Sequence, residues 1–115
     1  MPDLQVTLEP LVRIRGVRGA ILLSGEDGVI VAEALTEDVR SVGAAALVAS
    51  LVDRTNALSE VLGRGNVRCL QLHAEGGSIL VARVPGEMLL VLLAGPQTPV
   101  GLARLELIKI AERIA

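Results

Sequence analysis

The chain has 115 residues, with 11 basic and 13 acidic side chains and a formal net charge of −2. It contains no aromatic residue, whereas proteins that bind single-stranded nucleic acid stack the bases on aromatic rings and carry a basic excess. These features argue against nucleic acid as a partner, and no apolar run reaches the roughly 18 residues of a membrane span. Cys69 is the only cysteine, so an intrachain disulfide is excluded.

The N-terminal residues lack the basic and apolar regions of a signal peptide. A lone cysteine also fits a reducing compartment. We therefore expect a cytoplasmic protein whose residues 1–115 form a single domain of ordinary size, with an apolar fraction of 51% from which to build a core.

The first predicted elements are a short helix over residues 8–15 and two strands. Thr7 is the predicted cap of the helix, with Pro10 in its first turn, where a missing N–H does no harm. Residues 21–23 and 29–32 are unbroken apolar runs, a pattern typical of strands that are covered on both faces.

Between these runs lies the acidic glycine loop of residues 25–28, Gly-Glu-Asp-Gly. A calcium loop requires ligands spaced as D-x-D-x-D-G, and a phosphate loop requires G-x-x-x-x-G-K followed by Ser or Thr. Neither pattern is present. Because Asp-Gly is a strong hairpin signal, we interpret the loop as a turn, with no metal bound.

A long helix is predicted next, over residues 37–62. Thr36 is its predicted cap, Glu37 and Asp38 complement the positive end of its dipole, and Gly63 ends it. Such a helix of about 26 residues is roughly 39 Å long, whereas a strand of seven residues covers about 23 Å. The helix is therefore expected to extend beyond any sheet on which it packs.

Two apolar stripes run along this helix. One consists of bulky residues and the other mostly of small ones, so we expect two neighbours, one of them close. The small stripe fits either ordinary packing on the sheet or a subunit interface, and we favour the interface. The bulky residues are Leu47, Leu51, Leu58, Val61 and Leu62, and the small stripe comprises Val42, Ala45, Ala46, Ala49 and Val52.

Three strands follow, over residues 67–74, 78–84 and 88–94, and then a C-terminal helix from Val100 to about Ile114. The last two strands are apolar on both faces, whereas the first has one half-polar face, which indicates an edge strand. The order α-β-β-α-β-β-β-α predicts an α+β fold. We expect a five-stranded antiparallel sheet with the long helix on one face and the two terminal helices on the other.

The half-polar face carries the residues closest to a catalytic pattern. Cys69 and His73 lie on the same side of the strand, but residues i and i+4 of a strand are about 13 Å apart, too far for a nucleophile–base pair within one chain. The two could meet only across a twofold axis. One histidine is also too few for a zinc site of ordinary composition. We therefore expect no enzyme, no catalytic or metal site and no cofactor.

The chain resembles the roadblock family, small domains of the dynein light chain and bacterial MglB type. The resemblance rests on three segments in this order: "VRGAILLSGEDGVIVAEA", "SVGAAALVASLVDRTNALSEVLGRG" and "MLLVLLAGPQTPVGLARLEL". It implies a homodimer that pairs the third strand and the long helix across a twofold axis. It also implies binding of a Ras-like small GTPase, as a scaffold or as a modulator of the GTPase cycle.

The residues to which this resemblance assigns roles lie on the long helix and the third strand. A small-molecule sensing domain of similar α/β layering is the alternative function, although the absence of aromatic side chains argues against a ligand cavity. The expected dimer contacts are Val42, Ala45, Ala46, Ala49, Val67, Cys69, Gln71 and His73, and the expected GTPase contacts are Arg40, Asp53 and Arg54.

Overall fold

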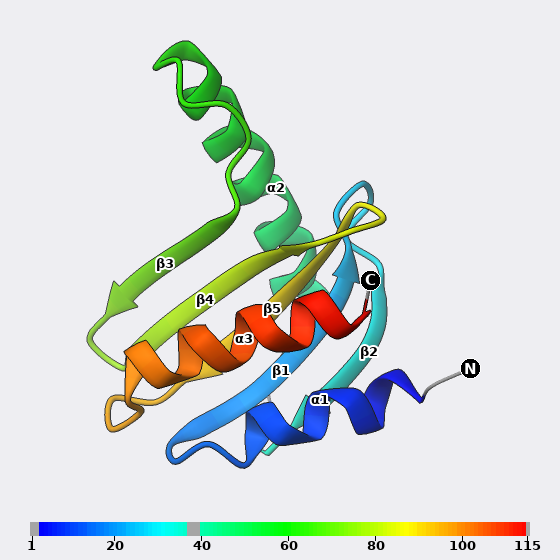
Figure 1. Cartoon of the computed structure of the whole chain (residues 1–115), viewed down its shortest axis with the longest axis vertical. Coiled ribbons are helices and arrows are strands. Elements are labelled where there is room, and N and C mark those ends of the chain that lie inside the picture. Colours follow the sequence, from blue (N-terminus) through cyan, green and yellow to red (C-terminus); the bar gives the residue numbers. More distant parts are fainter. Residues whose placement is uncertain (1–2, 37–39, 115) are drawn as a thin grey trace.

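The computed structural model describes residues 3–36 and 40–114. Three helices and five strands follow one another in the predicted order (Figure 1). The elements are α1 (Leu4–Val12), β1 (Val17–Ser24), β2 (Ile30–Leu35), α2 (Ser41–Val61), β3 (Cys69–Ala74), β4 (Gly77–Val84), β5 (Met88–Ala94) and α3 (Val100–Ile114).

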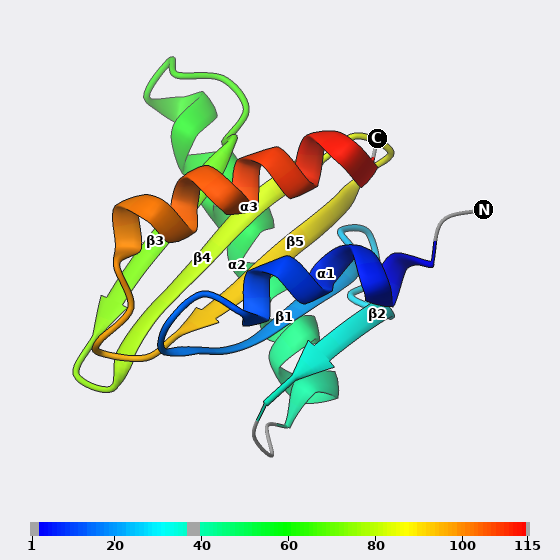
Figure 2. The same ribbon diagram turned by 60° about the horizontal axis from the view of Figure 1, so that its bottom comes forward.

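The strands form one antiparallel sheet in the order β2-β1-β5-β4-β3. Helices α1 and α3 cover one face and α2 crosses the other, as Figures 1 and 2 show. The predicted α+β fold, with the long helix opposite the terminal pair, is therefore confirmed. In the described part of the chain, none of the helices is both long and apolar enough to cross a membrane.

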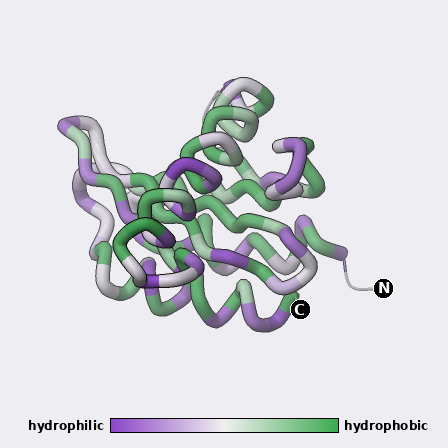
Figure 3. The backbone as a smooth tube through the Cα atoms, turned by 90° about the horizontal axis from the view of Figure 1, so that it is seen from above, coloured by the Kyte–Doolittle hydropathy of each residue, from purple (hydrophilic) through white to green (hydrophobic). Residues whose placement is uncertain are grey.

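Two apolar layers hold the helices to the sheet, and the central strands contribute to both. On β1, for example, Leu22 packs toward α1 and α3, while Ile21 and Leu23 pack toward α2. Because successive side chains of a strand point to opposite faces, a strand between two helix layers must be apolar throughout. The strands accordingly form a hydrophobic middle layer (Figure 3).

The prediction of two covered faces is right for the first apolar run and wrong for the second. Strand β1 is buried along most of its length, but β2 is an edge strand in which Val31 is 46% exposed. Among the described residues β2 pairs with β1 alone. An apolar run does not distinguish a central strand from an edge strand.

The helix starts also differ from the prediction. Helix α1 begins four residues earlier than expected, because the carboxylate of Asp3 accepts a hydrogen bond from the backbone N–H of Gln5 at 3.0 Å and serves as its cap. Helix α2 begins at Ser41 and ends at Val61. The hydroxyl of Thr36 donates to the carbonyl of Arg18 at 2.8 Å, so Thr36 does not cap α2.

Other predicted boundaries shift by smaller amounts. Glu37 and Asp38, which were expected in the first turn of the long helix, lie outside the described residues. Strand β3 begins at Cys69, two residues later than predicted, because the backbone N–H of Val67 donates to the side chain of Asn56 at 2.9 Å. The loop after α2 is thereby attached to the helix.

The acidic glycine loop is the predicted hairpin turn between β1 and β2. The N–H of Gly28 donates to the carbonyl of Ser24 at 2.8 Å, and Gly28 adopts a φ of 72°. The carboxylate of Asp27 accepts a hydrogen bond from the N–H of Val29 at 3.1 Å, and this bond lowers the pKa of Asp27. A Cβ on Gly28 would lie 3.0 Å from the Cα of Ala46, so the turn packs closely against α2.

Candidate functional site

Helix α2 carries an uncovered apolar stripe along the side that faces β3. Its members recur at about three and four residues, so they share one face of the helix. These side chains are between 38% and 84% exposed, whereas a soluble monomer rarely exposes a contiguous apolar surface of this kind. The stripe consists of Leu47, Leu51, Leu58, Val61 and Leu62.

The C-terminal turns of α2 extend past the end of the sheet, as the sequence predicts (Figure 1). A helix of 21 residues is roughly 32 Å long, and β3, with six residues, is roughly 20 Å long. The segment after the helix folds back on it, since the hydroxyl of Ser59 donates to the carbonyl of Gly65 at 2.6 Å. The apolar side chains of these turns therefore have no cover from the sheet.

Strand β3 is the open edge of the sheet next to the stripe. It pairs only with β4, in a register that runs from Cys69 opposite Ala82 to Ala74 opposite Gly77. The backbone groups on its outer side thus have no neighbouring strand among the described residues. A free edge of this kind is a template for pairing with another chain.

A groove of about 230 Å³ lies between α2 and the two strands at this edge, β3 and β4. Its lining is wholly apolar, and it joins the exposed stripe to the open strand. The lining residues are Ala44, Leu47, Val48, Leu51, Leu70, Leu72, Ile79 and Val81. We call the stripe, the groove and the outer edge of β3 the α2–β3 surface.

The structure separates the helix residues that were expected at a dimer interface. Ala45 and Ala49 are 1% and 6% exposed and pack against their own sheet with Val52, which is the ordinary packing considered as the alternative. Their side chains are thus occupied by contacts within the chain. Val42 and Ala46 are exposed, but Ala46 lies next to Gly28 of the β1–β2 turn.

The expected strand residues lie at the open edge but differ in exposure. Val67, Cys69 and Gln71 are half-buried and His73 is exposed. The side chains of Cys69 and His73 do not form a catalytic pair. His73 Nδ1 is 2.8 Å from the hydroxyl of Ser78, its partner in register on β4, and His73 Nε2 is 3.0 Å from Gln71 Nε2.

Burial raises the pKa of the Cys69 thiol. A raised pKa reduces the fraction of thiolate, which is the nucleophilic form of cysteine. Within residues 3–36 and 40–114, no three His, Cys, Asp or Glu side chains gather in a way that could hold a metal ion.

The charged residues expected to contact a GTPase are all exposed. Arg40 precedes the first turn of α2, and Asp53 and Arg54 lie in its second half. Asp53 also lines a polar hollow of about 390 Å³ together with Glu26 and Asn56. The hollow lies between α2, the β1–β2 turn and the β4–β5 turn, and shares no lining residue with the groove of the α2–β3 surface.

Sequence reasoning recognised the bulky stripe but expected a subunit contact at the small one, which the structure packs on the sheet. The signal was the spacing of Leu47, Leu51 and Leu58, which places three leucines on one side of the helix. The contribution of Leu70 and Leu72 was also missed. The alternation of β3 places them on the face opposite Cys69, but that pattern does not reveal which face borders α2.

Comparison with known proteins places this arrangement among solved structures. The chain is 27% identical to a structure described as "MglB with tetrameric arrangement", with a TM-score of 0.91 over 97% of this chain and 85% of that one. It is 25% identical to the gliding protein MglB of Thermus thermophilus, with a TM-score of 0.90 and the same coverage. No curated protein matches.

A third structure shows the same fold at lower identity. It is a Roadblock/LC7 domain from Streptomyces avermitilis, 22% identical, with a TM-score of 0.89 over 98% of this chain and 95% of that one. The family model of the Roadblock/LC7 domain matches residues 3–94, which is well over half of the chain. The chain therefore belongs to the Roadblock/LC7 family.

Proposed function

We propose that the protein is a homodimer joined through the α2–β3 surface. In this dimer the two β3 strands pair antiparallel across a twofold axis, and the stripe of each α2 packs against the α2 of the other protomer. One contact would thus cover both the free edge and the apolar side chains. The single observation that carries the proposal is the continuity of the exposed stripe, the apolar groove and the open edge.

The apolar side chains of this surface are sufficient in number for a stable contact. Full burial of one leucine or valine contributes about 1.5–3 kcal/mol, and each protomer offers the five residues of the stripe. Association costs roughly 4–15 kcal/mol in lost translational and rotational freedom. Even partial burial of ten such side chains offsets this cost.

We further propose that the dimer binds a Ras-like small GTPase as a non-enzymatic adaptor or regulator. Membership of the Roadblock/LC7 family and the likeness to MglB support this function. Arg40, Asp53 and Arg54 present both signs of charge on the exposed surface of α2 and are the candidate contacts. The engaged histidine and the raised thiol pKa give no support to catalysis by the chain itself.

The dimer is tested by light scattering on a matched pair of variants. Leu51→Glu introduces a charge into the α2–β3 surface, where Leu51 is 38% exposed. Val31→Glu introduces the same charge at the opposite edge of the sheet, where Val31 is 46% exposed. We expect dimers for the wild type and Val31→Glu and a folded monomer for Leu51→Glu. A wild type that is monomeric at micromolar concentration contradicts the proposal.

The GTPase function is tested by binding and nucleotide hydrolysis with the Ras-like GTPases of the same cell. We expect one of them to bind the dimer, and Asp53→Arg, in the polar hollow apart from the α2–β3 surface, to weaken this binding while the protein remains dimeric. Arg113→Glu, in the last turn of α3 on the other side of the sheet, is the control and should bind normally. The proposal fails if none of these GTPases binds and no hydrolysis rate changes.

A further inference from the structure

The sheet has two open edges, and the proposed dimer uses only one of them. In the described part of the chain, β2 pairs with β1 alone and β3 pairs with β4 alone. If both edges paired with other copies, growth would not stop at two protomers, because each added copy would present a further open edge. A dimer therefore requires that the two edges differ.

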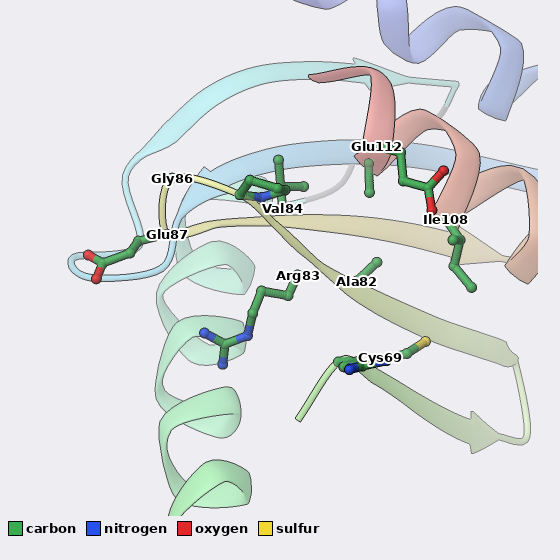
Figure 4. Close-up of a pocket in the computed structure, with 11 residues that line it drawn as sticks. Cys69, Ala82, Arg83, Val84, Gly86, Glu87, Ile108 and Glu112 are labelled. Carbon is green, nitrogen blue, oxygen red and sulfur yellow. The ribbon is translucent and has the colours of Figure 1, made fainter. Parts of the chain in front are cut away.

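The edge at β3 carries nothing that opposes pairing. Its six residues, Cys69–Ala74, include no Asp, Glu, Lys or Arg, and their register with β4 runs without a shift. On the side of α3, the thiol of Cys69 points toward Ile108, and both line a hollow of about 560 Å³ (Figure 4). On the other side, Leu70 and Leu72 line the groove of the α2–β3 surface. A second strand can approach this edge without removing water from a charge.

The edge at β2 is apolar apart from one residue. Val29 and Val31 are 59% and 46% exposed, and the only charged side chain of Ile30–Leu35 is Glu33. An apolar edge of this kind is liable to pair with another chain. Glu33 lies opposite Ile21 in the register with β1, and Ile21 packs toward α2. Since opposed residues of paired strands point to the same face, Glu33 lies on the α2 side of the sheet.

Glu33 is half-buried, and its surroundings do not compensate its charge. The carboxylate oxygen Oε2 is buried and has no hydrogen-bond partner within residues 3–36 and 40–114. A buried acceptor without a partner lowers the stability of a fold, most of all when it is charged. Because Glu33 costs the protomer stability, its presence calls for an explanation outside the packing of the protomer.

We propose that Glu33 closes the β2 edge to a second copy of the chain and so confines self-association to β3. Glu33 lies next to the midpoint of β2, so antiparallel pairing of two such strands places the two Glu33 Cα atoms about 5–8 Å apart. Like charges at this position destabilise a strand pair. An added strand would also remove the water that still reaches the half-buried carboxylate, and desolvation of an unpaired charge opposes association.

An irregularity of β2 acts in the same direction. The register with β1 shifts between Leu22 and Leu23, whose partners are Ala32 and Ile30, so Val31 is an extra residue in the strand. Such a bulge bends the strand and disturbs the hydrogen-bond ladder that a neighbour would continue. The bulge remains when Glu33 is replaced, so a substitution of Glu33 tests the charge alone.

The substitution Glu33→Val tests the proposal, because valine suits a strand and lacks the carboxylate. Glu106→Val is the matched control. Glu106 is also half-buried, but it lies on α3, which packs over β4 and β5, and it contacts Lys109 at 3.5 Å. In light scattering over a series of protein concentrations, we expect the wild type and Glu106→Val to stay at the dimer mass. Glu33→Val should at least double that mass and grow with concentration. A Glu33→Val protein at the wild-type mass, or equal growth of both variants, would overturn the proposal.

Two double variants show whether the growth runs through β2. Val31→Lys in the Glu33→Val protein returns a charge to the same edge and should restore the dimer mass. Leu51→Glu in the Glu33→Val protein closes the α2–β3 surface, so β2 is the edge that remains open and the protein should form a dimer through it. Large assemblies that persist with Val31→Lys, or a monomer in the second case, would show that β2 is not the edge that Glu33 controls.

The failure of this proposal and that of the proposed dimer can be told apart. The closing of β2 does not depend on the α2–β3 contact, whereas the stop at two copies does. If the wild type is a monomer, the proposed dimer fails, and Glu33→Val should still convert the monomer into a dimer through β2. A Glu33→Val monomer would then refute both. If circular dichroism shows that Glu33→Val does not fold, Glu33→Thr, which has the same shape without the charge, takes its place in every measurement.

Discussion

The close contact between the β1–β2 turn and α2 makes Gly28 sensitive to substitution. Gly28 has a φ of 72°, and a Cβ at this position would lie 3.0 Å from the Cα of Ala46 and 3.3 Å from the carbonyl oxygen of Ala45. The neighbouring atoms belong to the helix backbone, which cannot rotate away as a flexible side chain would. Gly28→Ala therefore combines backbone strain with overpacking.

A control that has the strain without the contact is Gly63→Ala. Gly63 has a φ of 71°, and a Cβ there would meet nothing within 4 Å. The left-handed conformation costs a residue other than glycine about 1–2 kcal/mol, and overpacking adds roughly 1–3 kcal/mol. We expect Gly63→Ala to lower the free energy of unfolding by about 1–2 kcal/mol and Gly28→Ala by about 2–5 kcal/mol.

Urea denaturation followed by circular dichroism measures both losses, with all proteins at one concentration because dimerisation adds to apparent stability. At roughly 4 °C per kcal/mol for a chain of this size, Gly28→Ala should melt about 8–20 °C below the wild type and Gly63→Ala about 4–8 °C below it. Equal losses for the two variants would refute the argued contact between the turn and α2.

Three further predictions concern single side chains. Because burial raises the pKa of Cys69, we expect iodoacetamide to alkylate it more slowly at pH 8 than it alkylates a free cysteine peptide. If the alkylation rate of Cys69 rises with pH around a midpoint at or below that of the peptide, this prediction is wrong. The folded-state pKa of Asp27 is lowered, so its stabilising effect is present above 3.8 and lost as pH falls through the folded pKa. Urea titrations of Asp27→Ala and the wild type should thus differ at pH 7 and converge in acid, and a difference independent of pH would be the contrary result. Thr36→Val removes the hydrogen bond to Arg18 and should cost about 1 kcal/mol in the same titration, and an unchanged unfolding midpoint would show that the bond contributes nothing.

Local patterns in the sequence were sufficient to predict the element types, their order and the two helix layers. The apolar runs of β4 and β5 and the turn at Asp27-Gly28 depend on neighbours close in sequence, and both are as predicted. The half-polar face of β3 likewise indicated its edge position. The burial of β2 could not be predicted in this way, because the order of strands in the sheet depends on contacts between distant segments.

The candidate site shows the same limit. The two stripes of α2 could be recognised from periodicity, but periodicity does not tell which stripe packs on the sheet. Ala45 and Ala49 fit closely against β1 and β5 because they are small, which leaves the bulky leucines outside. The caps were misassigned for a related reason. A threonine such as Thr36 is as common after a strand as before a helix. Its hydroxyl donates to the carbonyl of Arg18 on β1, so it follows strand β2 and does not cap α2.

The dimer through the α2–β3 surface is the central claim, and the distance between two spin labels on Cys69 tests it most directly. Light scattering should first give twice the 12.0 kDa mass of the chain for the labelled protein. Antiparallel pairing of β3 (Cys69–Ala74) with full overlap places the two Cys69 Cα atoms about 18 Å apart. A dimer through the β2 edges would separate them by nine strand spacings, or roughly 43 Å. We expect pulsed electron paramagnetic resonance to report the short distance, and a distance near the longer value, or a monomer without dipolar coupling, would contradict the proposed dimer.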